Sequence, residues 1–378
     1  MSRKRQNKHS KTQWLIILGY LLIGAACGVL ILAYLDHHRG GAATLLRMLL
    51  LFLCMYGAML IQIIIHEAGH LVFGLATGYR FNSYRIFNLM WLKEDGKIRF
   101  RKLSVAGTGG QCLMNPPDLQ DGKMPVMLYN FGGAILNLIS ALIFGGAALL
   151  CPAWSFGQVV LLFLALIGAA FALMNGLPLG TGAVNNDGRN ALDISRNPEA
   201  LRAFWIQMKV NELISRGIRV RDMPEEWFEM PSDEGMQNGI IATVGVLACN
   251  RMMDELRFEE ADRLMAHVLA KNNGVVGLYR VLLTCDRMFM EMIGKNRRNV
   301  LDGMLTKEQQ KIMKAMKQYP SVLRTEYAYA LLSEKDTGKA EDALKRFRKA
   351  AEAYPYPGEI RAEQELIDLA GEKAANRT

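Results

Sequence analysis

Two histidines and a glutamate stand close together near the end of a long apolar run. His66, Glu67 and His70 form the pattern H-E-x-x-H. On a helix, residues four apart lie on one face, so both imidazoles can reach one ion. Zinc accepts two imidazole nitrogens and keeps positions for a third protein ligand and a water. Glu67 can take the proton from that water, so the spacing predicts a zinc centre that carries out hydrolysis.

The surroundings of this motif strengthen the prediction of a metal. Isoleucines precede it, and Leu71, Val72 and Phe73 follow it. An ionisable side chain at membrane depth costs about 2.5–3.5 kcal/mol or more, and such side chains are rarely without function. Three of them within five residues therefore indicate a metal ion or a water-filled cavity.

The third ligand is less clearly defined by the sequence. Asp187 offers a hard carboxylate oxygen shortly after the last long apolar run, within the segment Asn185-Asn186-Asp187-Gly188. An Asp-Gly pair is also common in ordinary turns. The spacing alone supports a ligand and a turn equally.

The elements that must position these residues are membrane helices. A bilayer core needs roughly 20 apolar residues for each helical crossing. Four runs meet this requirement, at residues 14–35, 48–78, 126–151 and 156–178. We therefore expect a mainly α-helical, polytopic membrane domain over residues 14–190, preceded by a basic tail at 1–13.

The distribution of basic residues predicts the orientation. Lysines and arginines cluster before the first run and again between the second and third runs. The positive-inside rule then places both termini in the cytoplasm and the metal towards the cytoplasmic face of the cell membrane. The net charge of +9 fits contact with an anionic leaflet. The sequence lacks a basic stripe interleaved with aromatics, the pattern that would indicate nucleic-acid binding. The six cysteines contain no CxxC pair, which disfavours a thiolate zinc site.

A small β-hairpin is predicted at the membrane surface, over about residues 84–105. Asp95-Gly96 is a strong hairpin signal, and the following residues alternate between basic and apolar. The free edge of such a hairpin could hold an extended substrate by strand addition. A hairpin that only seals the helix bundle is an alternative.

The sequence of the second half predicts a helical cytoplasmic domain at residues 240–378. A linker region at 191–239 is expected to join it to the membrane domain. Gly338, Ala343, Phe347, Ala350 and Pro355 follow the pattern of a tetratricopeptide-like repeat. Such helix pairs stack and form grooves for peptides or proteins. We expect a partner-docking role, with a simple stabilising bundle as the alternative.

With these residues, the sequence resembles the site-2 protease family of intramembrane zinc metalloproteases over residues 45–190. Three ordered motifs carry the resemblance: H-E-x-x-H, a G-x-x-x-N element at Gly133 to Asn137, and N-x-x-P at Asn175 followed by D-G. The resemblance implies zinc binding by His66, His70 and Asp187, with Glu67 as the base. It also implies that Asn175 hydrogen-bonds the substrate carbonyl or oxyanion, and that Asn137 packs helices or orients substrate.

The chain departs from the family pattern at two places. Ala134 stands where the family has proline, and Pro178 is separated from Asp187 by more residues than is usual. The second departure makes Asp193 the alternative third ligand.

Together these features predict a zinc endopeptidase that hydrolyses membrane-tethered peptides or proteins near the cytoplasmic face. A non-hydrolytic membrane scaffold that recruits partners through its helical repeats is the competing hypothesis.

Overall fold

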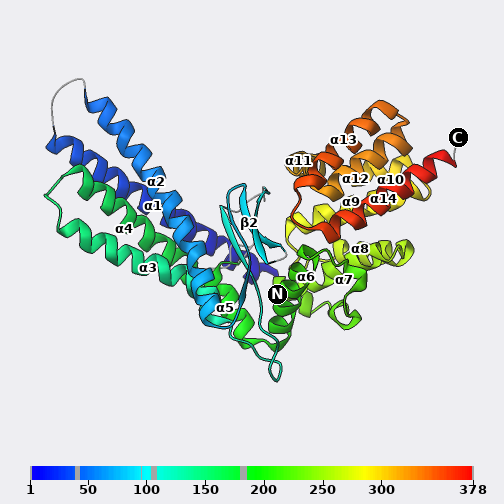
Figure 1. The fold of residues 1–378 in the computed structure, drawn as a ribbon, viewed down its shortest axis with the longest axis horizontal. Helices are drawn as coiled ribbons and strands as arrows, with labels where there is room; N and C mark the ends of the chain where they lie inside the picture. Colours follow the sequence, from blue (N-terminus) through cyan, green and yellow to red (C-terminus); the bar gives the residue numbers. More distant parts are fainter. Residues whose placement is uncertain (1, 39–42, 95, 104–108, 179–184, 377–378) are drawn as a thin grey trace. The chain divides into compact units, whose positions relative to one another are not determined.

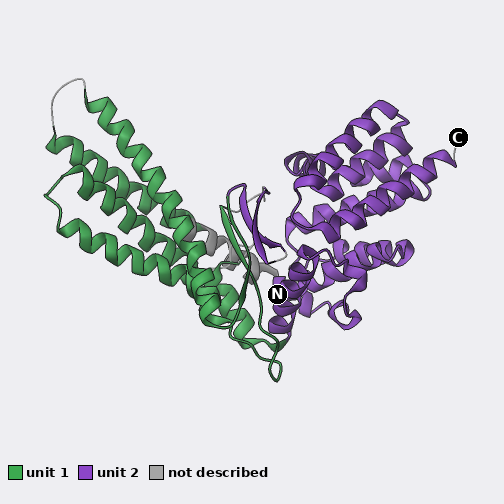
Figure 2. Ribbon diagram, in the orientation of Figure 1, with its two compact units in different colours: residues 1–86, 109–198 green, residues 87–108, 199–378 purple. Residues whose placement is uncertain are grey.

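The computed structural model describes residues 2–38, 43–94, 96–103, 109–178 and 185–376. The chain is mainly helical, with four long apolar helices, an antiparallel four-stranded sheet and a helical C-terminal region (Figure 1). It divides into two compact units, residues 1–86 with 109–198 and residues 87–108 with 199–378 (Figure 2). The predicted fold class is confirmed.

Four helices of the first unit are long and apolar enough to cross a membrane. They are α1 (Ser2–His37), α2 (Ala43–Ala76), α3 (Met127–Leu149) and α4 (Phe156–Gly176), with the candidate span of α1 beginning at Ile17. Large apolar side chains cover their outer surfaces, among them Leu142 and Leu149. Lipid would cover these side chains, so the helices indicate an integral membrane protein. Helix α1 begins at Ser2, so the predicted basic tail is part of this helix.

Helices α2 and α3 approach each other through a pair of glycines. A Cβ atom on Gly69 would lie 2.2 Å from the carbonyl oxygen of Gly132, and one on Gly132 would lie 2.5 Å from that of Gly69. Any larger residue would force the helices apart, as at other small-residue crossings in membranes. Since Gly69 belongs to H-E-x-x-H, this crossing brings α3 directly against the motif.

The sheet is larger than the predicted hairpin. Strands β2 (Leu89–Glu94) and β3 (Lys97–Lys102) form the hairpin that the sequence predicts, with Trp91 opposite Phe100. Two further strands, β1 (Arg80–Ile86) and β4 (Gly110–Asn115), pair with each other in the first unit. The strand order is β3-β2-β1-β4, which leaves β4 at one edge.

The region at 191–239, predicted as a linker, contains regular structure. Helix α5 (Asp187–Arg196) belongs to the first unit, and α6 (Pro198–Ser215) begins the helical part of the second. Short 3-10 turns η1, η2 and η3 follow at Val220–Asp222, Glu225–Trp227 and Gly235–Gln237. The remaining helices are α7 (Gly239–Asp254), α8 (Phe258–Ala270), α9 (Gly277–Ile293), α10 (Arg298–Met304), α11 (Lys307–Ala315), α12 (Pro320–Ala328) with its π-helical extension η4 (Tyr329–Glu334), α13 (Thr337–Ala353) and α14 (Pro357–Ala375).

Four residues of the predicted repeat lie on α13, and Pro355 follows this helix. Helices α12 and α13 pack together, and Ala343 and Phe347 of α13 are buried in the core of this unit. These contacts agree with a helix–turn–helix arrangement, and the tetratricopeptide assignment stays a prediction.

A buried charge cluster joins α9, α12 and α14. Arg324 is 1% exposed; its Nη2 lies 2.6 Å from Oδ1 of Asp286 and its Nη1 lies 3.1 Å from Oε2 of Glu363. Glu359 accepts a hydrogen bond from the Tyr354 hydroxyl at 3.2 Å. Burial raises the pKa of Glu359 to about 7 and that of Glu363 to about 8, because the attraction of one guanidinium, shared among three carboxyl groups, does not offset the loss of hydration.

These raised pKa values predict that the docking of α14 weakens in alkaline solution. The folded state keeps protons that the unfolded chain loses above about pH 4.3, so the stabilisation falls as the pH rises from there and levels off above the folded-state pKa values of about 7 and 8. Between about pH 6 and about pH 8.5, amide exchange in α14, corrected for intrinsic rates, should reveal a loss on the order of 1 kcal/mol or more. Glu363→Gln should flatten this dependence, whereas Glu372→Gln on the exposed face of α14 should leave it unchanged. Equal pH dependence in both variants would contradict the assignment.

Candidate metal centre

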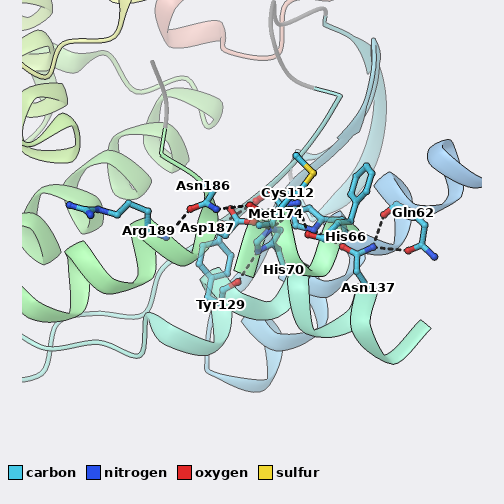
Figure 3. Close-up of polar contacts among 12 residues, drawn as sticks. Gln62, His66, His70, Cys112, Tyr129, Asn137, Met174, Asn186, Asp187 and Arg189 are labelled. Carbon is cyan, nitrogen blue, oxygen red and sulfur yellow. Dashed lines mark hydrogen bonds and ion pairs between the residues drawn. The ribbon is translucent and has the colours of Figure 1, made fainter. Parts of the chain in front are cut away.

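Three side chains of the first unit converge on one point. The Nε2 atom of His66 lies 3.0 Å from Oδ2 of Asp187, that of His70 lies 3.5 Å from the same oxygen, and the two Nε2 atoms are 3.3 Å apart. Figure 3 shows these side chains gathered between their helices. A tetrahedral ion with bonds of about 2.0–2.1 Å requires ligand atoms separated by about 3.3 Å. The group could therefore hold a metal ion.

The protonation of the two rings leaves acceptor atoms facing one another. His70 donates its Nδ1 hydrogen to the carbonyl oxygen of Tyr129 at 2.8 Å, since that oxygen can only accept. His66 has its Nδ1 2.8 Å from Oδ1 of Asn137. In neutral imidazoles so bonded, both Nε2 atoms carry lone pairs. They point towards a buried Asp187 oxygen that, with the rings in this form, accepts no hydrogen bond from the described residues.

This arrangement fits a cation better than a proton. Burial by itself raises the pKa of Asp187, but positive charge and N–H donors on the two histidines, when these are protonated, outweigh burial and lower that pKa below its ordinary value. Asp187 is thus held as a carboxylate. One proton shared between Asp187 and a ring satisfies two of the three acceptors, whereas a metal ion satisfies all three at once.

Local structure at the start of α5 holds Asp187 in place. Asn186 caps the helix by accepting a hydrogen bond from the Arg189 amide, and its own amide donates to the carbonyl oxygen of Met174 at 2.6 Å. A Cβ atom on Gly188 would lie 2.2 Å from the carbonyl oxygen of Gly176. The D-G element therefore meets the end of α4, where the N-x-x-P element begins, and only glycine fits at this contact.

The alternative ligand, Asp193, is engaged elsewhere. Its Oδ2 accepts a hydrogen bond from Nε of Arg189 at 2.8 Å and one from Asn185 at 3.4 Å. The carboxylate beside the two histidines is that of Asp187. The extra residues at 180–182 lie outside the described residues.

Glu67 lies beside the metal ligands and against the edge strand of the sheet. It is 8% exposed, and a Cβ atom on Gly110 would lie 2.6 Å from both its Cγ and its Oε1. The backbone at the start of β4 therefore packs directly on the predicted base.

The two asparagines of the predicted site differ in their contacts. Asn137 lies behind His66 and is fully buried, so its contacts support a role in holding that ring. Asn175 donates its side-chain hydrogen to the carbonyl oxygen of Phe171 at 3.0 Å. The predicted roles of both asparagines towards a substrate stay predictions.

Sequence reasoning missed Gln62, which bonds Asn137. The available signal was a polar residue four positions before His66 in an otherwise apolar run.

Comparison of the chain with protein-family models, curated proteins and solved structures finds no match. The resemblance to the site-2 proteases therefore stays a prediction that depends on its three motifs.

The glycine of the G-x-x-x-N element is predicted to be essential for the geometry of the centre. A Cβ atom on Gly133 would lie 2.5 Å from Cε1 of His66, so Gly133→Ala must displace the ring. Bound metal, measured in the purified protein, should fall at least about tenfold, the scale seen when a ligand loses its orientation. Gly146→Ala on the same helix meets nothing within 4 Å and serves as the control. Normal metal content in both variants would refute the predicted displacement.

Replacing Asp187 and Asp193 separately by asparagine tests which of them is the third metal ligand. Asp187→Asn keeps the shape of the side chain but removes the charge that the site needs, so metal affinity should fall by at least about tenfold. Asp193→Asn loses only its contacts with Arg189 and Asn185, so it should bind metal normally. The opposite result would identify Asp193 as the ligand.

Proposed function

We propose that the chain is an intramembrane zinc endopeptidase that hydrolyses peptide bonds of membrane-tethered substrates near the cytoplasmic face. The single observation that supports this most strongly is the convergence of Asp187 with His66 and His70, which lie beside Glu67 on an apolar helix long enough to span a bilayer. The three motifs of the site-2 protease resemblance agree with it.

The donor set supports zinc as the metal. Two imidazoles and one carboxylate are ligands that zinc accepts in catalytic sites with an open fourth position. When bound, zinc supplies a Lewis acid that lowers the pKa of a bound water to about 7. His66, His70 and Asp187 would hold it.

Glu67 is the proposed general base. It follows the first ligand in the sequence and is largely shielded from solvent. It would take the proton from the attacking water and then deliver it to the leaving amine, the role of this residue in H-E-x-x-H enzymes. Asn175 is the proposed donor to the developing oxyanion, which requires its amide to leave the Phe171 carbonyl.

Strand β4 is the proposed site of substrate alignment. It lies at the edge of the sheet, and its first residue, Gly110, packs on Glu67. Cleavage requires an extended backbone, and an extended segment added to β4 would pass beside the base. From the sequence, strand addition was predicted at the edge of the hairpin, whereas we propose it at β4, which follows the hairpin in the sequence.

The helical C-terminal unit is the proposed docking module for a protein partner or substrate. Tetratricopeptide-like pairs such as α12 and α13 support this part of the proposal. The expected substrates are single-span regulators, remnant signal peptides or small peptide precursors.

The decisive variant is Glu67→Gln, because it keeps the size of the side chain and removes the base. Cleavage of a library of single-span peptides in reconstituted vesicles should fall about 10²–10⁴-fold. The variant should retain the zinc content of the native protein, since Glu67 is not a ligand. Equal cleavage by both proteins, or none by the native protein, would instead favour the non-hydrolytic scaffold.

A further inference from the structure

A continuous chain of buried hydrogen bonds leads from the backbone of α4 to His66. Gln62 donates its Nε2 hydrogen to the carbonyl oxygen of Leu164 at 2.9 Å. Asn137 donates its Nδ2 hydrogens to both carbonyl oxygens of Gln62, at 2.7 Å to Oε1 and 3.0 Å to the peptide oxygen. The Oδ1 atom of Asn137 then faces Nδ1 of His66 at 2.8 Å. Figure 3 shows the part of this chain from Gln62 to His66.

The direction of each bond in this chain follows from its starting point. A peptide carbonyl can only accept, so Gln62 must turn its amide nitrogen towards Leu164 and its oxygen towards Asn137. Two oxygens of residue 62 then require the nitrogen of Asn137, and the oxygen of Asn137 is left for His66. His66 must therefore carry its hydrogen on Nδ1, which leaves the Nε2 lone pair for a metal ion.

The residues around this series of hydrogen bonds accommodate the side-chain amides of Gln62 and Asn137. Gln62 and Asn137 are both 0% exposed, where an unpaired polar group would cost about 1–3 kcal/mol. A Cβ atom on Gly168 would lie 2.7 Å from Nε2 of Gln62, so the absence of a side chain there makes room for the amide. Ser140 adds a further donor to Oε1 of Gln62 at 3.1 Å.

The second histidine does not need such an arrangement. Nδ1 of His70 bonds a peptide carbonyl directly, and that oxygen fixes the position of its hydrogen without help. The acceptor of His66 is a side-chain amide, which presents an oxygen in one orientation and a nitrogen in the other. His66 is thus the ligand whose tautomer depends on other side chains.

We propose that Asn137 is a positioning residue that sets the metal-binding tautomer of His66, and that Gln62 fixes the orientation of Asn137. This inference rests on the proposed zinc centre, but it is independent of which substrate is cleaved. Partners that orient a histidine ligand in this way typically contribute 10–100-fold to metal affinity.

Zinc affinity of the full-length protein in detergent, measured by competition with a chelator, tests the role of Asn137. Asn137→Leu removes the acceptor and should weaken zinc binding by about 10–100-fold. Asn137→Asp keeps an acceptor for His66 but loses the donor to the two Gln62 oxygens, so it should bind zinc more weakly than the native protein but more tightly than Asn137→Leu. Thermal unfolding of the metal-free proteins reports separately whether the helices still pack.

Combining variants tests the role of Gln62. With asparagine at position 137, Gln62→Leu should weaken zinc binding, because one of the two oxygens that orient the amide is lost. With aspartate at position 137 no orientation is needed, so Gln62→Leu should not weaken binding further. Ser140→Ala, which removes a donor to Gln62 but no bond of the chain, is the matched control and should bind zinc normally.

The outcomes separate this inference from the proposed enzyme. A native protein that binds no zinc would overturn the metal centre, and with it the inference. Zinc binding that is equally weak in Asn137→Leu and Asn137→Asp would show that Asn137 only packs helices. The zinc-affinity measurement contains no substrate. It therefore tests Asn137 and Gln62 independently of whether Glu67→Gln abolishes cleavage.

Discussion

Three electron-rich atoms face one another where α5 meets the last turns of α2, and the surrounding structure depends on how their mutual repulsion is offset. The Nε2 atoms of His66 and His70 and a carboxylate oxygen of Asp187 lie within 3.5 Å of one another. In an apolar setting such a convergence is unfavourable without a positive charge between the atoms. A divalent cation would offset this repulsion, and the group could hold such an ion.

The fold brings these atoms together through contacts that tolerate no extra volume. Gly69 and Gly132 let α2 and α3 approach, Gly133 makes room for the ring of His66, and Gly188 lets α5 meet the end of α4. Polar groups behind the ligands then fix their orientation, through the carbonyl of Tyr129 and the amide of Asn137. Metal centres depend on this kind of support, because the groups that orient a ligand typically contribute 10–100-fold to metal affinity.

Local sequence patterns predicted the parts of this site that depend on local structure. The four apolar runs defined the membrane helices, and the spacing of His66 and His70 on one helix defined two ligands. The partner of His66 was beyond such reasoning, because Asn137 is 71 positions away and its role depends on which atom of its amide faces the ring. The choice between Asp187 and Asp193 likewise required the cap at Asn186. Strands β1 and β4 were missed, since β4 follows β1 only after 23 intervening residues. The helices within the region at 191–239, such as α6, were also not predicted from the sequence.

X-ray absorption at the zinc edge of the full-length protein tests the central claim most directly, because it reports the atoms bound to the metal and requires no substrate. The account predicts about one zinc per chain with nitrogen and oxygen neighbours at about 2.0–2.2 Å, two of them imidazoles. A protein without bound metal would contradict it, and so would sulfur neighbours at about 2.3 Å, the distance of thiolate ligands.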